Sequence, residues 1–208
     1  MLWLVRDVLG TALVPARTFR RWLEKPKPLG RALWTVAGTG VLYALTSLGL
    51  AVSGAVPLVP PFFRLPDGNY YFWQMIFVGP GFLLTWIAAS GLLRLFGPGK
   101  GPRKLLREAA SLAGPSLAVP LLAAWLPQAV QAVLMVLGMN QEEFVEIVSE
   151  PGIWQVLHVG SYAIACVWAI LLFTRAARLS QSAGRWKSII AGVLTAAMTG
   201  ISFVLFLR

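Results

Sequence analysis

Five long stretches of this sequence contain no charged residue, and they constrain the fold more than any other feature. They cover residues 32–63, 68–93, 109–141, 151–174 and 188–207. Each can supply the roughly 20 apolar residues that cross a bilayer as a helix. Charged residues make up only 12% of the chain, against about 25% in soluble domains. The sequence therefore predicts an all-α, polytopic membrane helix bundle with five transmembrane helices, and it excludes a soluble enzyme and a disulfide-rich secreted domain.

The basic residues alternate between the connections. Of the 18 Lys and Arg, seven precede the first stretch, five surround the second connection and four lie in the fourth, whereas the first connection holds one and the third holds none. Basic connections stay on the cytoplasmic side of a membrane. We therefore expect a cytoplasmic N-terminus, an external C-terminus and a cytoplasmic face of 16 basic and three acidic residues. The frequent use of alanine, leucine and arginine favours a bacterial source, and hence the bacterial inner membrane. No soluble domain is left to bind nucleic acid.

Residues 1–30 form an amphipathic leader on the cytoplasmic face. Its apolar Phe19 and Trp22 oppose Arg17, Arg20 and Arg21, a pattern typical of short helices that lie in the membrane interface. The alternative is that the leader docks onto the bundle. No small-residue cleavage site follows a short apolar core, so a signal peptide is not indicated.

Residues 31–208 form the five-helix domain, with spans at about 31–53, 72–95, 109–126, 153–173 and 186–206. The third uncharged stretch is too long for one crossing, since 33 residues at ~1.5 Å each exceed a core of ~30 Å. Pro115, Pro120 and Pro127 are the candidates that break it. We expect one span over about 109–126 followed by an outer interfacial helix over 127–139, with a single proline-kinked span that extends into the outer interface as the alternative. Two half-length segments that return to the inner side are not expected, because they would place the basic fourth connection outside.

Small residues predict where helices pack closely. Gly192, Ala196 and Gly200 form a small-x-x-x-small row, which lets another helix of the bundle, or a second copy in a homodimer, approach closely. Glu108 lies where the third span enters the inner leaflet, and we expect it to hold Arg94 or Arg107. Pro115 follows a run of small residues and is assigned to helix packing as well.

The residues available for chemistry do not point to an enzyme. The span cores lack Asp, Glu, Lys and Arg, which transport and catalysis in a bilayer usually require. His158 is the single histidine and Cys166 the single cysteine, so no catalytic residue, metal site or cofactor is predicted. Lys100 lies in a glycine-rich turn, but the next residue is Gly101 and not the Ser or Thr that a phosphate-binding loop requires. A membrane hydrolase that pairs Ser116 with His158 is the weakest alternative.

The residues expected to contact lipid or a partner lie on the predicted cytoplasmic face. Each Lys or Arg close to an anionic membrane surface contributes about 1 kcal/mol of attraction. The predicted contacts are Arg17, Arg20, Arg21, Lys25, Lys100, Arg103 and Lys104.

The order of these features resembles the small prokaryotic members of the Yip1 family. The matching parts are the basic leader with the segment VPARTF at 14–19, the first two spans, the glycine-containing turn that leads into LLREAASLAGP at 105–115, and two final spans that open at Trp154 and Trp186. The resemblance implies a five-helix bundle with a cytoplasmic N-terminus and no enzymatic activity. The eukaryotic branch of the family is associated with small GTPases of the Rab type. Because the D-L-Y-G-P motif of that branch is absent here, we do not expect this chain to bind a Rab protein.

These observations predict a non-enzymatic membrane scaffold that interacts with membrane lipids, with a preference for anionic ones, or with a membrane protein partner. The alternative is a transporter or permease component with a cavity at the proline-broken third span.

Overall fold

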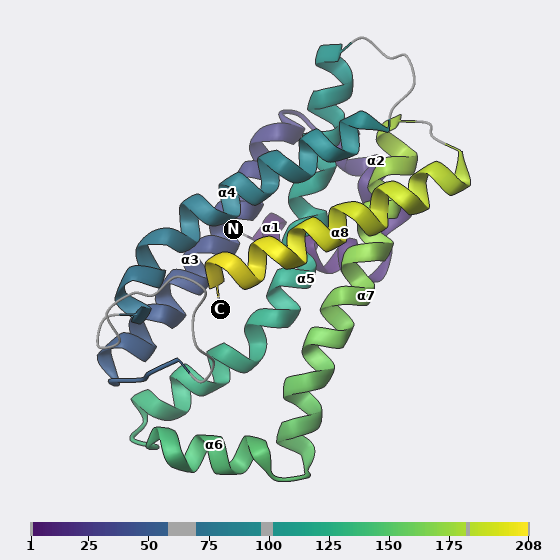
Figure 1. The fold of residues 1–208 in the computed structure, drawn as a ribbon. Helices are drawn as coiled ribbons and strands as arrows, with labels where there is room; N and C mark the ends of the chain where they lie inside the picture. The colour runs from purple at the N-terminus through teal and green to yellow at the C-terminus, as the bar shows by residue number, and fades with distance from the viewer. Residues whose placement is uncertain (1, 58–69, 97–101, 182–183, 208) are drawn as a thin grey trace.

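The computed structural model describes residues 2–57, 70–96, 102–181 and 184–207, and the side chains within 4–57, 70–96, 104–180 and 184–205. In this part of the chain the secondary structure is α-helical with no strand, which confirms the predicted all-α class (Figure 1). The helices are α1 (Leu2–Leu13), α2 (Pro15–Glu24), α3 (Pro28–Val52), α4 (Tyr70–Leu95), α5 (Pro102–Val136), α6 (Gln141–Ser149), α7 (Ile153–Gln181) and α8 (Arg185–Leu207).

Five of the described helices are long and apolar enough to cross a membrane, namely α3, α4, α5, α7 and α8. The predicted number of spans is therefore confirmed, although the helices extend past the predicted bounds. Helix α3 begins at Pro28, where a proline at the first helical position loses no hydrogen bond because that N–H would be unpaired anyway. Helix α7 continues to Gln181 instead of ending near residue 173, and it carries exposed Arg175 and Arg178 in its extension.

The third span differs most from the prediction. Helix α5 runs unbroken through Pro115, Pro120 and Pro127, so the expected break after residue 126 and the separate outer helix over 127–139 are both wrong. The alternative of a single span that continues past the prolines agrees with α5. A helix of 35 residues is about 52 Å long at 1.5 Å per residue, so its ends extend beyond a core of about 30 Å. Pro115 and Pro120 lie in the buried central part of α5, whereas Pro127 is half-buried. A proline within a helix removes one backbone hydrogen bond, and membrane helices tolerate it where neighbouring groups satisfy the freed carbonyl.

Helix α5 occupies the centre of the bundle. Every residue from Ser111 to Pro120 is buried, and α5 packs against α3, α4 and α7 as well as against α1 and α2. A helix enclosed on every side needs small side chains, and this segment supplies them at Ala113, Gly114, Ser116 and Ala118. Close packing of this kind drives helix association in lipid.

The leader contacts the bundle. Phe19 and Trp22 of α2 are fully buried and belong to the same hydrophobic core as Ala32 and Ala109. An amphipathic helix of a soluble protein buries its apolar side and exposes its polar side. Helix α1 does the reverse in part, since Asp7 and Thr11 are buried while its exposed side includes apolar residues. These exposed apolar residues are Val5, Leu9 and Leu13. Of the two alternatives for the leader, docking onto the bundle is the one that these contacts describe.

Helix α6 caps the end of the bundle opposite α2, as Figure 1 shows. Asn140 and Glu143 form a capping box, in which the Glu143 N–H donates to Asn140 Oδ1 at 2.8 Å and the Asn140 N–H donates to Glu143 Oε2 at 3.1 Å. The Gln141 amide joins α6 to the segment after α3, accepting from the Val56 N–H at 2.7 Å and donating to the Val56 carbonyl at 2.9 Å.

Candidate functional site

Exposed basic side chains gather at one end of the bundle. The spans alternate in direction, so the start of α3, the end of α4, the start of α5, the end of α7 and the start of α8 lie at the same end as α2 (Figure 1). We call this the basic end. Its exposed basic residues in the described part of the chain include Arg17, Arg20, Arg21, Lys27, Arg94, Lys104, Arg107, Arg175, Arg178, Arg185 and Lys187. The opposite end, called the acidic end, exposes Glu142, Glu143, Glu146 and Glu150.

The predicted lipid or partner contacts fall into three groups. Arg17, Arg20 and Arg21 are exposed on α2, and Lys104 is exposed near the start of α5. Lys25 is half-buried and forms an ion pair within the chain. Lys100 and the Arg103 side chain lie outside the described residues. The arginines of α2 and Lys104 are therefore the predicted residues that are accessible to an external contact.

Buried Asp7 is the centre of a charge cluster that the sequence did not indicate. Its carboxylate accepts from Lys25 Nζ at 2.6 Å and from Arg31 Nη1 at 3.2 Å, and its side chain is only 5% exposed. Lys25 also lies 5.7 Å from the centre of the Trp22 ring. The cluster joins α1 to Lys25, directly after α2, and to Arg31 in the first turn of α3. A buried carboxylate without these cations would be strongly unfavourable, so the cluster determines where α1 docks.

An apolar groove lies between α5, α7 and α8 and has a volume of about 310 Å³. Leu121, Ala165, Ala169 and Thr199 form its buried wall, while other lining residues are exposed along its open edge. These exposed lining residues are Cys166, Ile170, Val193, Ala197 and Gly200. The groove therefore opens sideways, onto the surface that faces lipid if these helices span a bilayer.

The predicted small-residue row on α8 has two different environments. At Gly192 the helix contacts α7 directly, since a Cβ there would clash with the backbone and side chain of Thr174. Ala196 is half-buried against the core. At Gly200 a Cβ would meet no atom within 4 Å, and the residue lines the groove instead. Helices α7 and α8 are thus in contact near the basic end and separate towards the acidic end.

The other two predicted packing residues lie on α5. Pro115 is buried in the central segment, in agreement with a packing role. Glu108 is half-buried at the basic end of α5. Gly114 was not predicted as a packing residue, although it lies directly against α3: a Cβ on Gly114 would be 2.7 Å from the Ala32 Cβ. Its place beside Pro115 in a run of small residues was the available signal.

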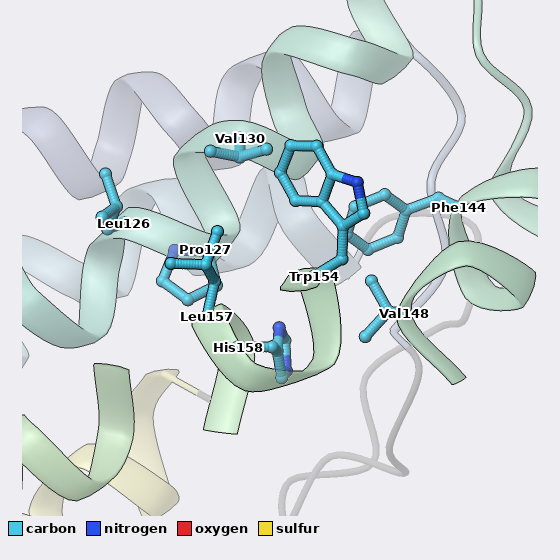
Figure 2. Close-up of a pocket in the computed structure, with 8 residues that line it drawn as sticks. All are labelled: Leu126, Pro127, Val130, Phe144, Val148, Trp154, Leu157 and His158. Atoms are coloured by element: carbon cyan, nitrogen blue, oxygen red, sulfur yellow. The ribbon is translucent and has the colours of Figure 1, made fainter. Parts of the chain in front are cut away.

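A second, smaller pocket of about 60 Å³ lies at the acidic end between α5, α6 and α7 (Figure 2). It is lined by Leu126, Pro127, Val130, Phe144, Val148, Trp154, Leu157 and His158. The His158 ring lies edge-on to Tyr162, with 5.4 Å between ring centres. The pocket is mainly apolar, and α6 contributes the buried Phe144 to its lining beside residues of α5 and α7.

The hydrolase alternative has no geometric support. Ser116 is fully buried and donates to the Leu112 carbonyl at 2.8 Å. Pro127, which lines the pocket beside His158, follows Ser116 by about 16 Å along α5 at 1.5 Å per residue. Among the described residues, no group of three or more His, Cys, Asp or Glu side chains could hold a metal ion.

Compared with family models, curated proteins and solved structures, the chain matches none. The resemblance to the Yip1 family stays a prediction.

Proposed function

We propose that this protein is a non-enzymatic integral membrane scaffold of the Yip1-like type, whose basic end binds anionic lipid head groups. The observation that carries the proposal is the collection of exposed Lys and Arg side chains at one end of five membrane-spanning helices, opposite an end that exposes four glutamates. A cationic surface at the membrane boundary attracts anionic lipids, at about 1 kcal/mol per residue. The docked leader supports the proposal because it holds Arg17, Arg20 and Arg21 outward.

The proposal includes an orientation, with the basic end in the cytoplasm of a bacterial cell and the acidic end outside. Cysteine labelling tests it. In a Cys166→Ala background, we expect Glu143→Cys to react with a membrane-impermeant maleimide on intact cells, and Arg20→Cys to react only after the cells are permeabilised. The opposite labelling pattern would contradict the orientation.

The lipid preference is tested by native mass spectrometry of the protein released from nanodiscs of mixed phosphatidylglycerol and phosphatidylcholine. The unchanged protein should retain phosphatidylglycerol preferentially. Replacing Arg17, Arg20 and Arg21 with Gln should lower that retention by roughly tenfold or more, since each charge contributes about 1 kcal/mol. The matched control replaces Glu142, Glu143 and Glu146 with Gln at the acidic end and should retain phosphatidylglycerol as before. Equal retention of both lipids by the unchanged protein would overturn the proposal.

The same measurement distinguishes a scaffold with a protein partner from one that acts through lipid alone. After gentle extraction from the native membrane, a mass increase equal to a second copy indicates a homodimer, and any other discrete protein mass indicates a membrane protein partner. Either result adds a partner to the scaffold.

The transporter alternative has one structural observation in its favour, because Pro120 of the long α5 lines the groove. Against it, the described lining residues of the groove include no charged side chain. A saturable solute flux in reconstituted vesicles that is lost in Pro120→Ala would replace the scaffold proposal with a transporter.

A further inference from the structure

We propose that helix α1 is embedded in the lipid leaflet at the basic end, where the side formed by Val5, Leu9 and Leu13 contacts the acyl chains. The proposed function concerns head groups and charge, whereas this inference assigns a contact with hydrocarbon to a different helix. It makes α1 a membrane element in addition to the five spans, one that enters a single leaflet without crossing the bilayer.

The first step of the argument is the distribution of side chains around α1. Asp7 and Thr11 are buried, and the Thr11 hydroxyl donates to the Asp7 carbonyl at 2.8 Å. Val5, Leu9 and Leu13 are four residues apart, so they lie along one side of the helix, and each is more than half exposed. At about 100° per residue, that side is opposite Asp7 and Thr11.

This distribution is unfavourable in water and favourable in lipid. In water, α1 would expose its apolar side and bury a carboxylate, and both changes cost free energy. Within a leaflet, polar side chains of a helix face the interior of the protein, while its apolar side chains contact the acyl chains. The polarity of α1 therefore indicates hydrocarbon as the medium on its outer side.

The second step is the position of α1 beside a spanning helix. Leu4 contacts α3 at Gly38, where a Cβ would be 3.5 Å from Leu4 Cδ2. Gly38 is the eleventh of the 25 residues of α3, and Arg31 is the last charged residue before it. A helix of this length measures about 37 Å and exceeds a core of about 30 Å by little. Gly38 therefore lies within the hydrocarbon at any tilt that lets α3 cross the bilayer.

The contact with Gly38 extends the lipid-facing surface of the bundle onto α1. Because Leu4 touches a residue inside the hydrocarbon, the start of α1 lies beside acyl chains and not in the aqueous phase. Helix α1 also packs against the central helix α5, and Figure 1 shows it nearer to the middle of the bundle than α2.

The third step is the place of the charged residues of α1. Asp7 is paired with Lys25 and Arg31, so its charge is compensated within the protein. Arg6 is exposed. An arginine side chain has a long apolar stem that lies along apolar surface while its guanidinium stays among the head groups. The charges of α1 are therefore compatible with a helix embedded in one leaflet.

The first experiment measures what covers the apolar side of α1. In a Cys166→Ala background, a nitroxide spin label is attached at Leu9→Cys, and the protein is placed in phosphatidylcholine nanodiscs. Power-saturation EPR compares the collision of the label with oxygen, which concentrates in hydrocarbon, and with a water-soluble nickel chelate. The references are Leu84→Cys, at an exposed position within the span α4, and Arg20→Cys, at an exposed position of α2.

We expect the oxygen-to-nickel collision ratio at Leu9→Cys to be about fivefold or more above that at Arg20→Cys and close to that at Leu84→Cys. A ratio equal to that of Arg20→Cys would mean that water covers this side. A label that neither reagent reaches would mean that another protein chain covers it. Either result would overturn the inference. Thermal unfolding in detergent verifies that each labelled variant folds.

The second experiment uses the unchanged chain, so it does not depend on the folding of a variant. The lipid is a phosphatidylcholine with a diazirine near the end of one acyl chain, which on irradiation inserts a carbene into neighbouring side chains. Trypsin then releases residues 7–17 of the leader and residues 188–208 of the last span. We expect adducts at Leu9 and Leu13, with the span peptide as the positive control. Adducts on 188–208 and none on 7–17 would overturn the inference.

Failure of the inference and failure of the proposed function give different results, because both experiments use a lipid without net charge. If the protein shows no preference for phosphatidylglycerol but residues 7–17 are labelled, the head-group proposal is overturned and the assignment of α1 stands. If phosphatidylglycerol is retained preferentially and residues 7–17 are not labelled, the assignment of α1 is overturned and the head-group proposal stands.

Discussion

Gly114 of α5 lies so close to Ala32 of α3 that a Cβ on the glycine would be 2.7 Å from the Ala32 Cβ and 2.9 Å from its Cα. Such distances are shorter than real Cβ contacts, and the Ala32 backbone atoms cannot move away as a flexible side chain would. The absence of a side chain at Gly114 therefore determines how closely the first span approaches the central helix.

Gly114→Val should destabilise the bundle because the new side chain must separate α3 from α5. We expect the free energy of unfolding to fall by about 1–3 kcal/mol, measured by circular dichroism during denaturant titration in detergent. Gly91→Ala is the control, because its Cβ enters open space, and alanine at a helical glycine should stabilise by up to ~1 kcal/mol. A Gly114→Val protein as stable as the unchanged one would contradict the close approach.

Asp7→Asn should loosen the docked leader. The substitution leaves Lys25 and Arg31 without their carboxylate, and these side chains are 22% and 27% exposed. Because water still reaches both cations, we expect a loss of about 1–2 kcal/mol, which is below the value for fully buried pairs. Hydrogen exchange should increase in α1 and α2 and remain unchanged in α8.

The exposed neighbour provides the control for this prediction. Arg6→Gln should leave exchange in α1 and α2 unchanged, since Arg6 is exposed on the same helix. A double-mutant cycle of Asp7→Asn with Lys25→Gln should give a coupling energy of at least about 0.5 kcal/mol. A coupling energy of zero would show that the 2.6 Å pair contributes nothing to docking.

Thr46→Val should weaken the contact between α3 and α5, because the Trp125 Nε1–H donates to Thr46 Oγ1 at 2.8 Å. Hydrogen bonds between membrane helices contribute about 0.6 kcal/mol on average and at most ~1.7. We expect a loss within that range for Thr46→Val and a smaller loss for Thr46→Ser, which keeps the oxygen. Equal stability of the two variants in the same denaturant titration would argue against the hydrogen bond.

Asn140→Ala should affect α6 alone. The substitution removes one half of the capping box, a change that costs roughly 1 kcal/mol in helices. Exchange should increase in α6 (Gln141–Ser149) while the midpoint of global unfolding stays within error, because the five long helices do not depend on this cap. Glu142→Ala, at an exposed position of the same helix, is the matched control. Increased exchange in α7 as well would mean that α6 and α7 unfold together.

The number of spans followed from charge alone. A charged side chain within the bilayer core is costly. The five uncharged stretches therefore predicted the five membrane-spanning helices, which the structure has as α3, α4, α5, α7 and α8. The gathering of basic residues at one end followed from the same pattern, because five successive crossings must alternate in direction.

The charge and hydropathy pattern did not predict that the third span is one continuous helix. Its length and its prolines favoured a break, but whether a helix continues through Pro127 depends on what surrounds it. The neighbours of α5 come from α1, α2, α3, α4 and α7, and hydropathy along the chain contains no information about such contacts. The same applies to Asp7, whose partners Lys25 and Arg31 follow much later in the sequence.

By itself, the sequence determined the helical class, the five spans and the charge of the two ends, because each depends on the transfer of a residue or a segment between water and lipid. Only the tertiary structure decided that α5 is central, that the leader docks through Phe19 and Trp22, and that α7 and α8 separate beyond Gly192 to leave a groove. These features depend on close packing between distant residues, where the presence or absence of one Cβ determines how near two helices approach.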